Sequence, residues 1–200
     1  IGDWKAAPVI ARDAELQEDL ADMDAAVRRC KAIVSGILMS AGEARGEAPQ
    51  VTTMRAFLTA LVEEARAGRM PGTVEFNDLF GADLAIISDP ALRQVIGNVL
   101  DNASEVSPEW IALTASRDGG MAVIEIADRG PGFSAEMIER FGQPYSSTKG
   151  RPGGGLGLFL LVNVLRKLGG SASVANRDVG GAMVRIVLPV STLAAKAEAA

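Results

Sequence analysis

Histidine is absent from this 200-residue sequence, and cysteine occurs once, as Cys30. Without histidine the chain offers no imidazole metal ligand, no histidine general base and no serine–histidine nucleophile pair. A single cysteine excludes an internal disulfide and a cysteine-based zinc site, and leaves only a bridge to another chain. Any chemistry must therefore depend on other residue types.

Aromatic residues, basic charge and long apolar runs are also scarce. Only 4% of the residues are aromatic, so the core must be mainly aliphatic. The net charge of −5 argues against a nucleic-acid or anionic-membrane surface. No apolar run approaches the ~20 residues that cross a bilayer, and the first residues lack the layout of a signal peptide. We therefore expect a cytoplasmic chain without membrane contact.

A long amphipathic helix is predicted from about residue 13 to residue 43, because small and apolar residues recur every three or four positions. The apolar stripe consists of Leu16, Leu20, Met23, Val27, Cys30, Val34, Ile37 and Leu38. A narrow stripe on so long a helix favours packing against a partner helix, and packing on its own domain is the alternative. The composition of residues 40–50 then predicts a linker.

The rest of the chain has a mixed α/β pattern. We predict helices at about 53–67, 90–105, from 134 onward and 156–168, and strands at 73–78, 84–88, 110–116, 121–128, 172–174 and 184–188. Asp89 and Pro90 are suited to begin the second of these helices. Because hairpins are mixed with helices, we expect a two-layer α/β sandwich whose sheet is covered on one face by helices. The predicted domains are 1–46, 47–192 and a frayed tail at 193–200.

Asn98 and Asn102 are four residues apart on one predicted helix, so their carboxamides lie on the same helix face. Amide oxygens are hard, neutral ligands that suit Mg²⁺, which is commonly shared with phosphate groups. Taken alone, two asparagines at this spacing are more often ordinary surface residues.

A carboxylate ends a strand face that is otherwise apolar, because Asp128 shares that face with Ile124 and Ile126. A buried carboxylate needs a hydrogen-bond donor, and an adenine amino group is one. Gly130 and Gly132 then let the backbone turn and approach a flat ring closely. A simple strand-ending turn is the alternative, because Asp, Gly and Pro are all turn residues.

A glycine-rich stretch precedes an apolar run with helical spacing, and consists of Gly153, Gly154, Gly155, Leu156 and Gly157. Backbone N–H groups at such a helix start can face a phosphate, whose charge the helix dipole favours. Lys149 and Arg151 lie just before the glycines and can add positive charge. Flexible loops use glycine too, so the order of the three motifs is more specific than any one of them.

In this order the motifs resemble those of the ATP-binding catalytic domain of sensor histidine kinases. These kinases belong to the wider family that includes the DNA gyrase, heat-shock chaperone and mismatch-repair ATPases. The similarity covers about residues 52–189. It rests on NVLDNA at 98–103, DRGPG at 128–132, RFGQPYSSTKG around Phe141, GGGLGL at 153–158 and a closing strand, GGAMVRIVLP, at 180–189.

The resemblance implies a role for each motif. Asp128 would bind the adenine amino group of ATP, and Asn102 and Asn98 would hold Mg²⁺. Residues 142–155 would form a lid over the phosphates, with Lys149 as a candidate phosphate contact. The implied reaction is transfer of the γ-phosphoryl group to a histidine and then to an aspartate of a response regulator, with the protein supplying positioning and charge stabilisation.

The predicted helix at 13–43 resembles the second helix of the family's dimerisation and phosphotransfer hairpin, which forms a four-helix bundle in a homodimer. The first helix of that hairpin carries the phospho-accepting histidine. The lack of histidine is explained if the sequence begins after that residue, and the chain would then bind ATP without phosphorylating itself. The complete protein would be cytoplasmic, or this chain would be the cytosolic part of a membrane-anchored sensor.

Three positions depart from the family pattern. Glu105 stands where many relatives have a basic residue that contacts a phosphate, and Ala182 stands where the closing strand commonly has threonine near the adenine. Asn98 stands where relatives that hydrolyse ATP have a glutamate that activates water. An amide cannot take that proton, which favours phosphoryl transfer over hydrolysis.

RRCKAI and QPYSSTKGRPGGGLGLFL further resemble the redox-responsive RegB/PrrB-type subfamily, in which a cysteine on the second hairpin helix is a redox switch. Arg28, Arg29 and Lys31 flank Cys30, and neighbouring cations favour the reactive thiolate of an accessible cysteine. The testable form of this hypothesis is a disulfide between subunits. A small buried hydrophobe is the alternative.

Two other functions stay open. An anti-sigma-factor-type serine kinase shares the asparagine motif and needs no histidine, although the long helix argues against it. A non-catalytic phosphotransfer scaffold would have eroded glycine motifs, and those of this sequence are intact.

Overall fold

The computed structural model describes residues 16, 23, 50–69, 74–143 and 156–195. The chain divides into two compact units, Ile1–Glu43 and Ala44–Ala200. In the first unit only Leu16 and Met23 are described; both are helical, and 40% and 49% of their surfaces are exposed. The rest of the helix predicted there, with Cys30, lies outside the described residues. All other described residues belong to the second unit.

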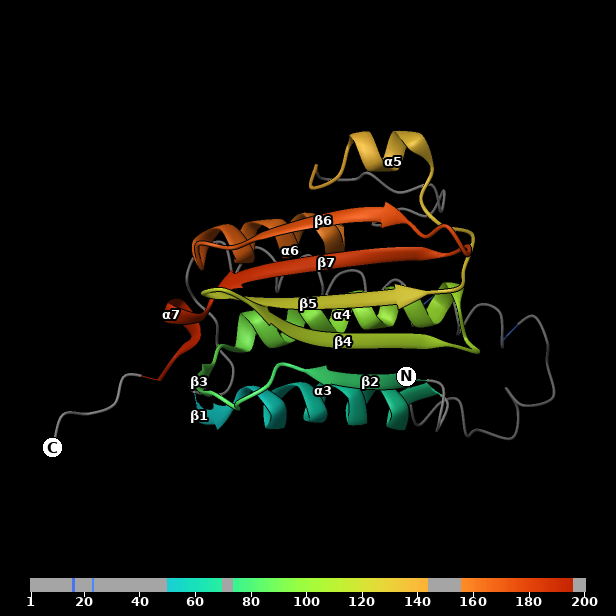
Figure 1. Ribbon diagram of the computed structural model, residues 1–200. Helices are drawn as coiled ribbons and strands as arrows, with labels where there is room; N and C mark the ends of the chain where they lie inside the picture. The colour runs from blue at the N-terminus through green and yellow to red at the C-terminus, as the bar shows by residue number, and fades with distance from the viewer. Residues whose placement is uncertain (1–15, 17–22, 24–49, 70–73, 144–155, 196–200) are drawn as a thin grey trace, which may run out of the picture. The chain divides into compact units, whose positions relative to one another are not determined.

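A five-stranded mixed sheet forms the centre of the second unit (Figure 1). In spatial order its strands are β2 (Val74–Leu79), β4 (Ile111–Asp118), β5 (Met121–Asp128), β7 (Ala182–Pro189) and β6 (Ser171–Asn176). β2 runs parallel to β4, and all other neighbours are antiparallel. The predicted hairpin is confirmed: only Gly119 and Gly120 separate β4 from β5, and Gly119 has a φ of 55° that glycine adopts without strain.

Helices cover one face of this sheet, as Figure 1 shows, and they are α3 (Met54–Arg69), α4 (Pro90–Val106) and α6 (Leu156–Lys167). The predicted apolar stripe of α4 is buried and consists of Leu92, Val95, Ile96, Val99, Leu100 and Ala103. Most of the core thus lies between the helices and the sheet, and the predicted two-layer sandwich is confirmed. No helix among the described residues combines the length and the apolar character that a membrane span requires.

The starts of two helices are fixed by capping side chains, of which the sequence predicted the first. Asp89 Oδ1 accepts the backbone N–H groups of Ala91 at 2.7 Å and Leu92 at 3.1 Å, and Pro90 occupies the first helical position. The short helix α5 (Ala135–Glu139) begins after Ser134, which accepts the N–H of Met137 at 3.2 Å. Each cap satisfies N–H groups that the helix itself leaves unpaired.

A second, two-stranded sheet was not predicted. It pairs β1 (Gln50–Thr53) with β3 (Ala85–Ser88) in antiparallel orientation. The strands predicted at 73–78 and 84–88 are confirmed as β2 and β3, but they lie in different sheets, since β2 belongs to the main sheet and β3 pairs with β1. Pairing over more than 30 residues leaves no local pattern, so the sheet that each strand joins could not be predicted from the sequence.

The predicted fraying of the tail is wrong for its first residues. The short helix α7 (Val190–Leu193) follows β7 and buries Leu193. Beyond it, the backbone N–H of Ala195 donates to the carbonyl of Ala85 at 2.9 Å. Packing by Leu193 and pairing with β3 fix this segment, although its small residues have little preference of their own.

The N-terminus of α3 is held by the segment between β2 and β3. Asp83 Oδ1 accepts the backbone N–H of Arg55 at 3.1 Å and that of Leu84 at 2.9 Å, and the guanidinium of Arg55 pairs with Asp78. Burial alone would raise the pKa of Asp83, but hydrogen bonds from the Thr53 side chain and from these two N–H groups lower it. The hydrogen bond from Arg55 is the main cause of the lowered pKa of Asp78.

We expect the domain to lose stability in acid through these two carboxylates. Because the folded pKa of Asp83 lies below its ordinary value of 3.8, its charged form stabilises the fold above that pH, and the stabilisation is lost as the pH falls through the folded pKa. Urea unfolding between about pH 6 and pH 2 should therefore show a smaller decrease in Asp83→Asn than in the wild type. Asp118→Asn, in the exposed β4–β5 hairpin, is the matched control. Parallel pH curves for Asp83→Asn and the wild type would contradict this account.

Candidate functional site

Asp128, the last residue of β5, is a buried carboxylate with 7% of its surface exposed. Its Oδ1 accepts the backbone N–H groups of Gly130 at 2.8 Å and Ala182 at 3.1 Å. No group in the described part of the chain donates a hydrogen bond to Oδ2. Because no completely buried side-chain oxygen of the described residues lacks a partner, Oδ2 keeps some of its surface exposed. Such a carboxylate is held by one oxygen and presents the other to a donor.

The backbone around Asp128 is packed closely at two glycines, and one of these positions requires glycine. Gly181 has a φ of 88°, and a Cβ there would lie 2.0 Å from the carbonyl oxygen of Asp128. A Cβ on Gly130 would lie 2.8 Å from Cγ2 of Val106, the last residue of α4. The turn after Asp128 therefore lies directly against the end of α4.

The C-terminal end of α4 is also tied to this turn by a hydrogen bond. Ser107 is buried; its hydroxyl accepts the backbone N–H of Arg129 at 3.1 Å and donates to the carbonyl of Trp110 at 2.5 Å. One side chain thus links α4, the start of β4 and the residue after Asp128. This fixes the distance between the carboxylate and the helix that carries the two asparagines.

Asn176, at the end of β6, holds the next part of the turn. Its Oδ1 accepts the N–H of Phe133 at 2.6 Å, and its Nδ2 donates to the carbonyl of Phe133 at 2.8 Å. Gly132 packs against the same amide, since a Cβ there would lie 2.7 Å from Asn176 Oδ1. Asn176 could not be identified from the sequence, because a lone asparagine at a strand end carries no distinctive signal.

The start of α6 lies against Asn102. A Cβ on Gly157, in the first turn of α6, would lie 3.2 Å from Nδ2 of Asn102. The structure therefore brings the helix that follows the glycine-rich stretch next to one of the two predicted Mg²⁺ ligands. Asn102 is exposed, and Asn98, one turn earlier on α4, is half-buried.

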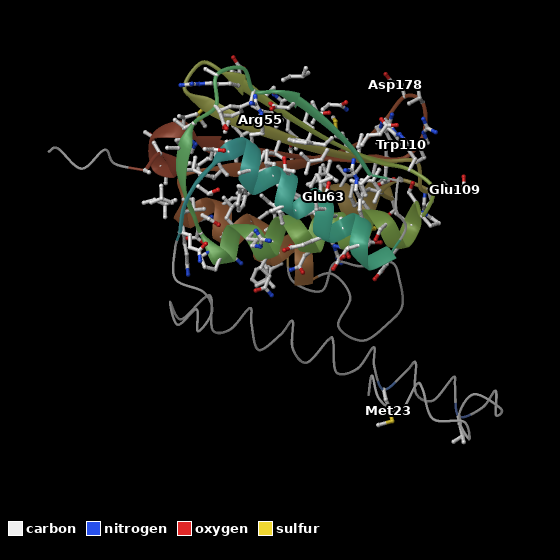
Figure 2. All side chains as sticks on the ribbon, turned by 90° about the horizontal axis from the view of Figure 1, so that it is seen from below. Met23, Arg55, Glu63, Glu109, Trp110 and Asp178 are labelled. Carbon is white, nitrogen blue, oxygen red and sulfur yellow. The ribbon has the colours of Figure 1, made fainter. Side chains whose placement is uncertain are left out.

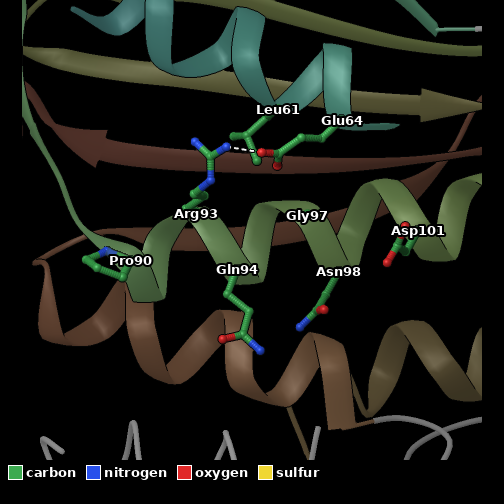
Figure 3. Close-up of a pocket in the computed structure, with 8 residues that line it drawn as sticks. All are labelled: Leu61, Glu64, Pro90, Arg93, Gln94, Gly97, Asn98 and Asp101. Atoms are coloured by element: carbon green, nitrogen blue, oxygen red, sulfur yellow. Dashed lines mark hydrogen bonds and ion pairs between the residues drawn. The ribbon is translucent and has the colours of Figure 1, made fainter. Parts of the chain in front are cut away.

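A groove of about 380 Å³ lies between α3 and α4 (Figure 3), and the residues that line it are Leu61, Glu64, Pro90, Arg93, Gln94, Gly97, Asn98 and Asp101. Figure 3 shows Glu64 and Arg93 paired across it. Of the predicted site residues it includes only Asn98, and neither Asp128 nor Asn102 lines it. We therefore centre the candidate site on the hydrogen bonds around Asp128 and not on this groove.

Several predicted phosphate contacts lie outside the described residues, namely Lys149, Gly153, Gly154 and Gly155. Leu156 begins α6, but its side chain is also outside the description. The lid and its contacts therefore stay predictions.

The residues present suit Mg²⁺ through neutral oxygens. In the described ranges no cluster of three Asp, Glu, His or Cys residues could hold a metal ion. Asn98 and Asn102 instead offer amide oxygens on one helix face, and Asn102 is exposed beside the start of α6. Two neutral ligands fit an ion whose other ligands are water and phosphate.

Ala182 has a second feature besides the hydroxyl that its side chain lacks, because its backbone N–H donates to Asp128. No sequence motif could have indicated this contact, because any residue except proline supplies the same N–H group.

Together these features define the nucleotide-binding domain of an ATPase class: a two-layer sandwich, a buried carboxylate at a strand end, a glycine turn, and an asparagine-bearing helix. Residues 88–192 match the family of histidine kinase-, DNA gyrase B- and HSP90-like ATPases. The chain belongs to this family.

Two relatives are similar over much of this chain. The C4-dicarboxylate transport sensor protein DctB of Pseudomonas aeruginosa is 32% identical over 167 residues, which cover 80% of this chain and 27% of that protein. The sensor histidine kinase component HK1 of Mycobacterium tuberculosis is 34% identical over 137 residues, covering 66% of this chain and 81% of that protein. The chain thus spans about a quarter of the first relative and most of the second.

Solved structures have the same fold. The mycobacterial sensor histidine kinase MprB is 28% identical with a TM-score of 0.56, over 70% of this chain and 97% of that one. Full-length ShkA in complex with AMPPNP is 23% identical with a TM-score of 0.66, over 92% of this chain and 40% of that one. The second similarity concerns the fold alone.

The two neighbouring glycines at the β6–β7 turn provide a test of the packing around Asp128. Gly180 and Gly181 have φ values of 89° and 88°, but a Cβ on Gly180 would meet nothing within 4 Å. Gly180→Ala should cost about 1–2 kcal/mol of unfolding free energy through backbone strain alone. Gly181→Ala should cost roughly 2–5 kcal/mol, because the clash with Asp128 adds to the same strain. Equal losses in urea unfolding would mean that the close approach at Gly181 does not constrain the site.

Proposed function

We propose that this chain is the ATP-binding catalytic domain of a two-component sensor histidine kinase. It transfers the γ-phosphoryl group of ATP to a histidine outside these 200 residues, and the group then passes to an aspartate of a response regulator. The observation that carries this proposal is the arrangement of Asp128, which is buried, bound through one oxygen and accessible through the other. Relatives named as sensor kinases support the same function.

Adenine recognition follows from the acceptor that Asp128 offers. The two backbone N–H groups on Oδ1 fix the rotation of the carboxyl group, so that Oδ2 accepts from the adenine amino group. Guanine has a carbonyl at the equivalent position and would place an acceptor against an acceptor. The site is thus built to select adenine by a hydrogen bond, which discriminates more strongly than apolar contact.

Phosphate and metal binding are assigned to the facing ends of α4 and α6. Asn102 and Asn98 would hold Mg²⁺, which when bound neutralises charge on the phosphate oxygens. Gly157 lies beside Asn102 at the start of α6, where backbone N–H groups favour negative charge. Lys149 and the glycines at 153–155 are proposed to complete the phosphate contacts.

Transfer is favoured over hydrolysis by the residue types at the site. Asn98 cannot act as a base toward water, and the sequence contains no histidine that could do so. The accepting histidine must therefore come from outside this sequence. This reaction implies two partners: a response regulator, and a second copy of the chain that dimerises through a helical hairpin. The redox role of Cys30 stays a prediction.

The two alternative functions are distinguished by two different measurements. The relatives named above are sensor kinases or sensor proteins, which gives no support to a serine kinase or a scaffold. Phosphohistidine is acid-labile and phosphoserine is acid-stable, so the stability of the phosphorylated product distinguishes the first alternative. A scaffold would not bind ATP.

We expect Mg²⁺ and a non-hydrolysable ATP analogue to raise the unfolding temperature of this chain. At a ligand concentration of ~100 times Kd the stabilisation is about 2.7 kcal/mol. For a domain of this size that corresponds to a shift of roughly 5–10 °C. The shift should require Mg²⁺ and should shrink in Asn102→Ala, because that variant lacks one of the two amide ligands.

Asn77→Ala is the matched control, since Asn77 lies on the edge strand β2 and binds Thr114. It should keep the full shift. A wild-type chain that gains no stability with saturating ligand would contradict the proposed function and favour the scaffold.

A further inference from the structure

The carbonyl oxygen of Asp128 lies just beyond the last pair of residues that join β5 to β7. That ladder ends where Ala127 pairs with Met183. The guanidinium of Arg177 reaches this oxygen from the β6–β7 turn, and its Nη1 donates to it at 2.6 Å. Asp128 is therefore held by a side chain 49 residues away as well as by its own neighbours.

Arg177 is itself held from two sides. Its backbone N–H donates to the carbonyl of Gly181 at 3.0 Å, and its carbonyl accepts the N–H of Gly180 at 3.0 Å. Its guanidinium lies over the indole ring of Trp110, 4.9 Å from the ring centroid. A guanidinium that is stacked on a ring keeps its N–H donors in one plane and one direction. It therefore holds the oxygen that it binds more rigidly than an unstacked side chain would.

Trp110 connects Arg177 to the start of β4. It immediately precedes β4, and the guanidinium of Arg129 also lies over its ring, 4.4 Å from the centroid. Figure 2 shows Trp110 at one end of the unit, near Glu109 and Asp178. Both the residue after Asp128 and the residue that binds its carbonyl thus converge on one indole ring.

We propose that Arg177, stacked on Trp110, is a positioning residue for adenine recognition, because it fixes the peptide plane of Asp128 and so aims the free carboxylate oxygen. This inference rests on the proposed function. Arg177 does not touch the base; it acts through Asp128. It therefore determines how well the site distinguishes adenine from a purine without the amino group, and not merely how stable the domain is.

The test is the ratio of two dissociation constants, for Mg²⁺–ATP and for Mg²⁺–inosine triphosphate, measured by calorimetric titration. Inosine triphosphate carries an oxygen in place of the adenine amino group. The wild type should bind it about 10- to 100-fold more weakly than ATP, as expected for loss of a hydrogen bond to a charged group. In Arg177→Ala this ratio should fall to roughly a third or less of the wild-type ratio, because a loosely held carboxylate discriminates less.

Arg185→Ala is the matched control, because Arg185 also lies at this sheet, on β7, but pairs with Glu125 at 2.7 Å and not with Asp128. It should keep the wild-type ratio. Trp110→Leu should lower the ratio in the same direction as Arg177→Ala. If Arg177→Ala does not fold, Arg177→Lys decides, since lysine keeps the charge and lacks the planar fork; its ratio should also fall.

An unchanged ratio in a folded Arg177→Ala, or failing that in Arg177→Lys, would overturn the inference and leave Arg177 a purely structural contact. The proposed function would still hold in that case. A wild-type chain that binds neither triphosphate would contradict the proposed function, and the inference with it.

Discussion

One buried carboxylate determines the arrangement of the site. Asp128 is buried at the end of the central strand β5, where a polar group needs hydrogen bonds in place of the water it has lost. Backbone N–H groups of Gly130 and Ala182 provide them, Arg177 binds the carbonyl, and Gly181 leaves room for that carbonyl. The surrounding turns from β5, β6 and β7 therefore share one constraint.

This constraint extends to the helices through α4. Ser107 ties the end of α4 to Arg129, and Gly130 packs against Val106, so the helix cannot shift without moving the residues that follow Asp128. Asn102 lies one turn earlier on α4, beside Gly157 of α6. Base recognition is assigned to the end of β5 and metal binding to α4. The contacts between α4 and the turn after β5 hold both in place.

The elements with strong local signals could be predicted from the sequence. Asp89 and Pro90 mark the start of α4, its stripe of aliphatic residues gives its buried face, and the glycines at 119–120 mark the hairpin. Those signals lie within a few residues of the structures they determine. β1 and the ordered start of the tail could not be predicted, since both depend on pairing with β3, which is distant in the sequence.

The candidate site divides in the same way. The side chains that would bind the ligand directly could be identified from their spacing and their order, namely Asp128, Asn98 and Asn102. The groups that hold them could not: Asn176 and Arg177 are ordinary polar residues at a strand end and in a turn, and Ala182 acts through its backbone. Their roles arise only when antiparallel pairing places β6 and β7 beside β5.

The central claim is that Asp128 recognises the base, and titration of Mg²⁺–ATP into the wild type and Asp128→Asn tests it most directly. Asparagine has nearly the same shape, and its Oδ1 can still accept both backbone N–H groups, so the fold should persist. Its Nδ2, however, would place a donor against the adenine amino group. We predict that Asp128→Asn binds ATP at least about 100-fold more weakly. A folded variant that binds ATP within about twofold of the wild type would contradict the account, since loss of a hydrogen bond to a charged group costs more than that.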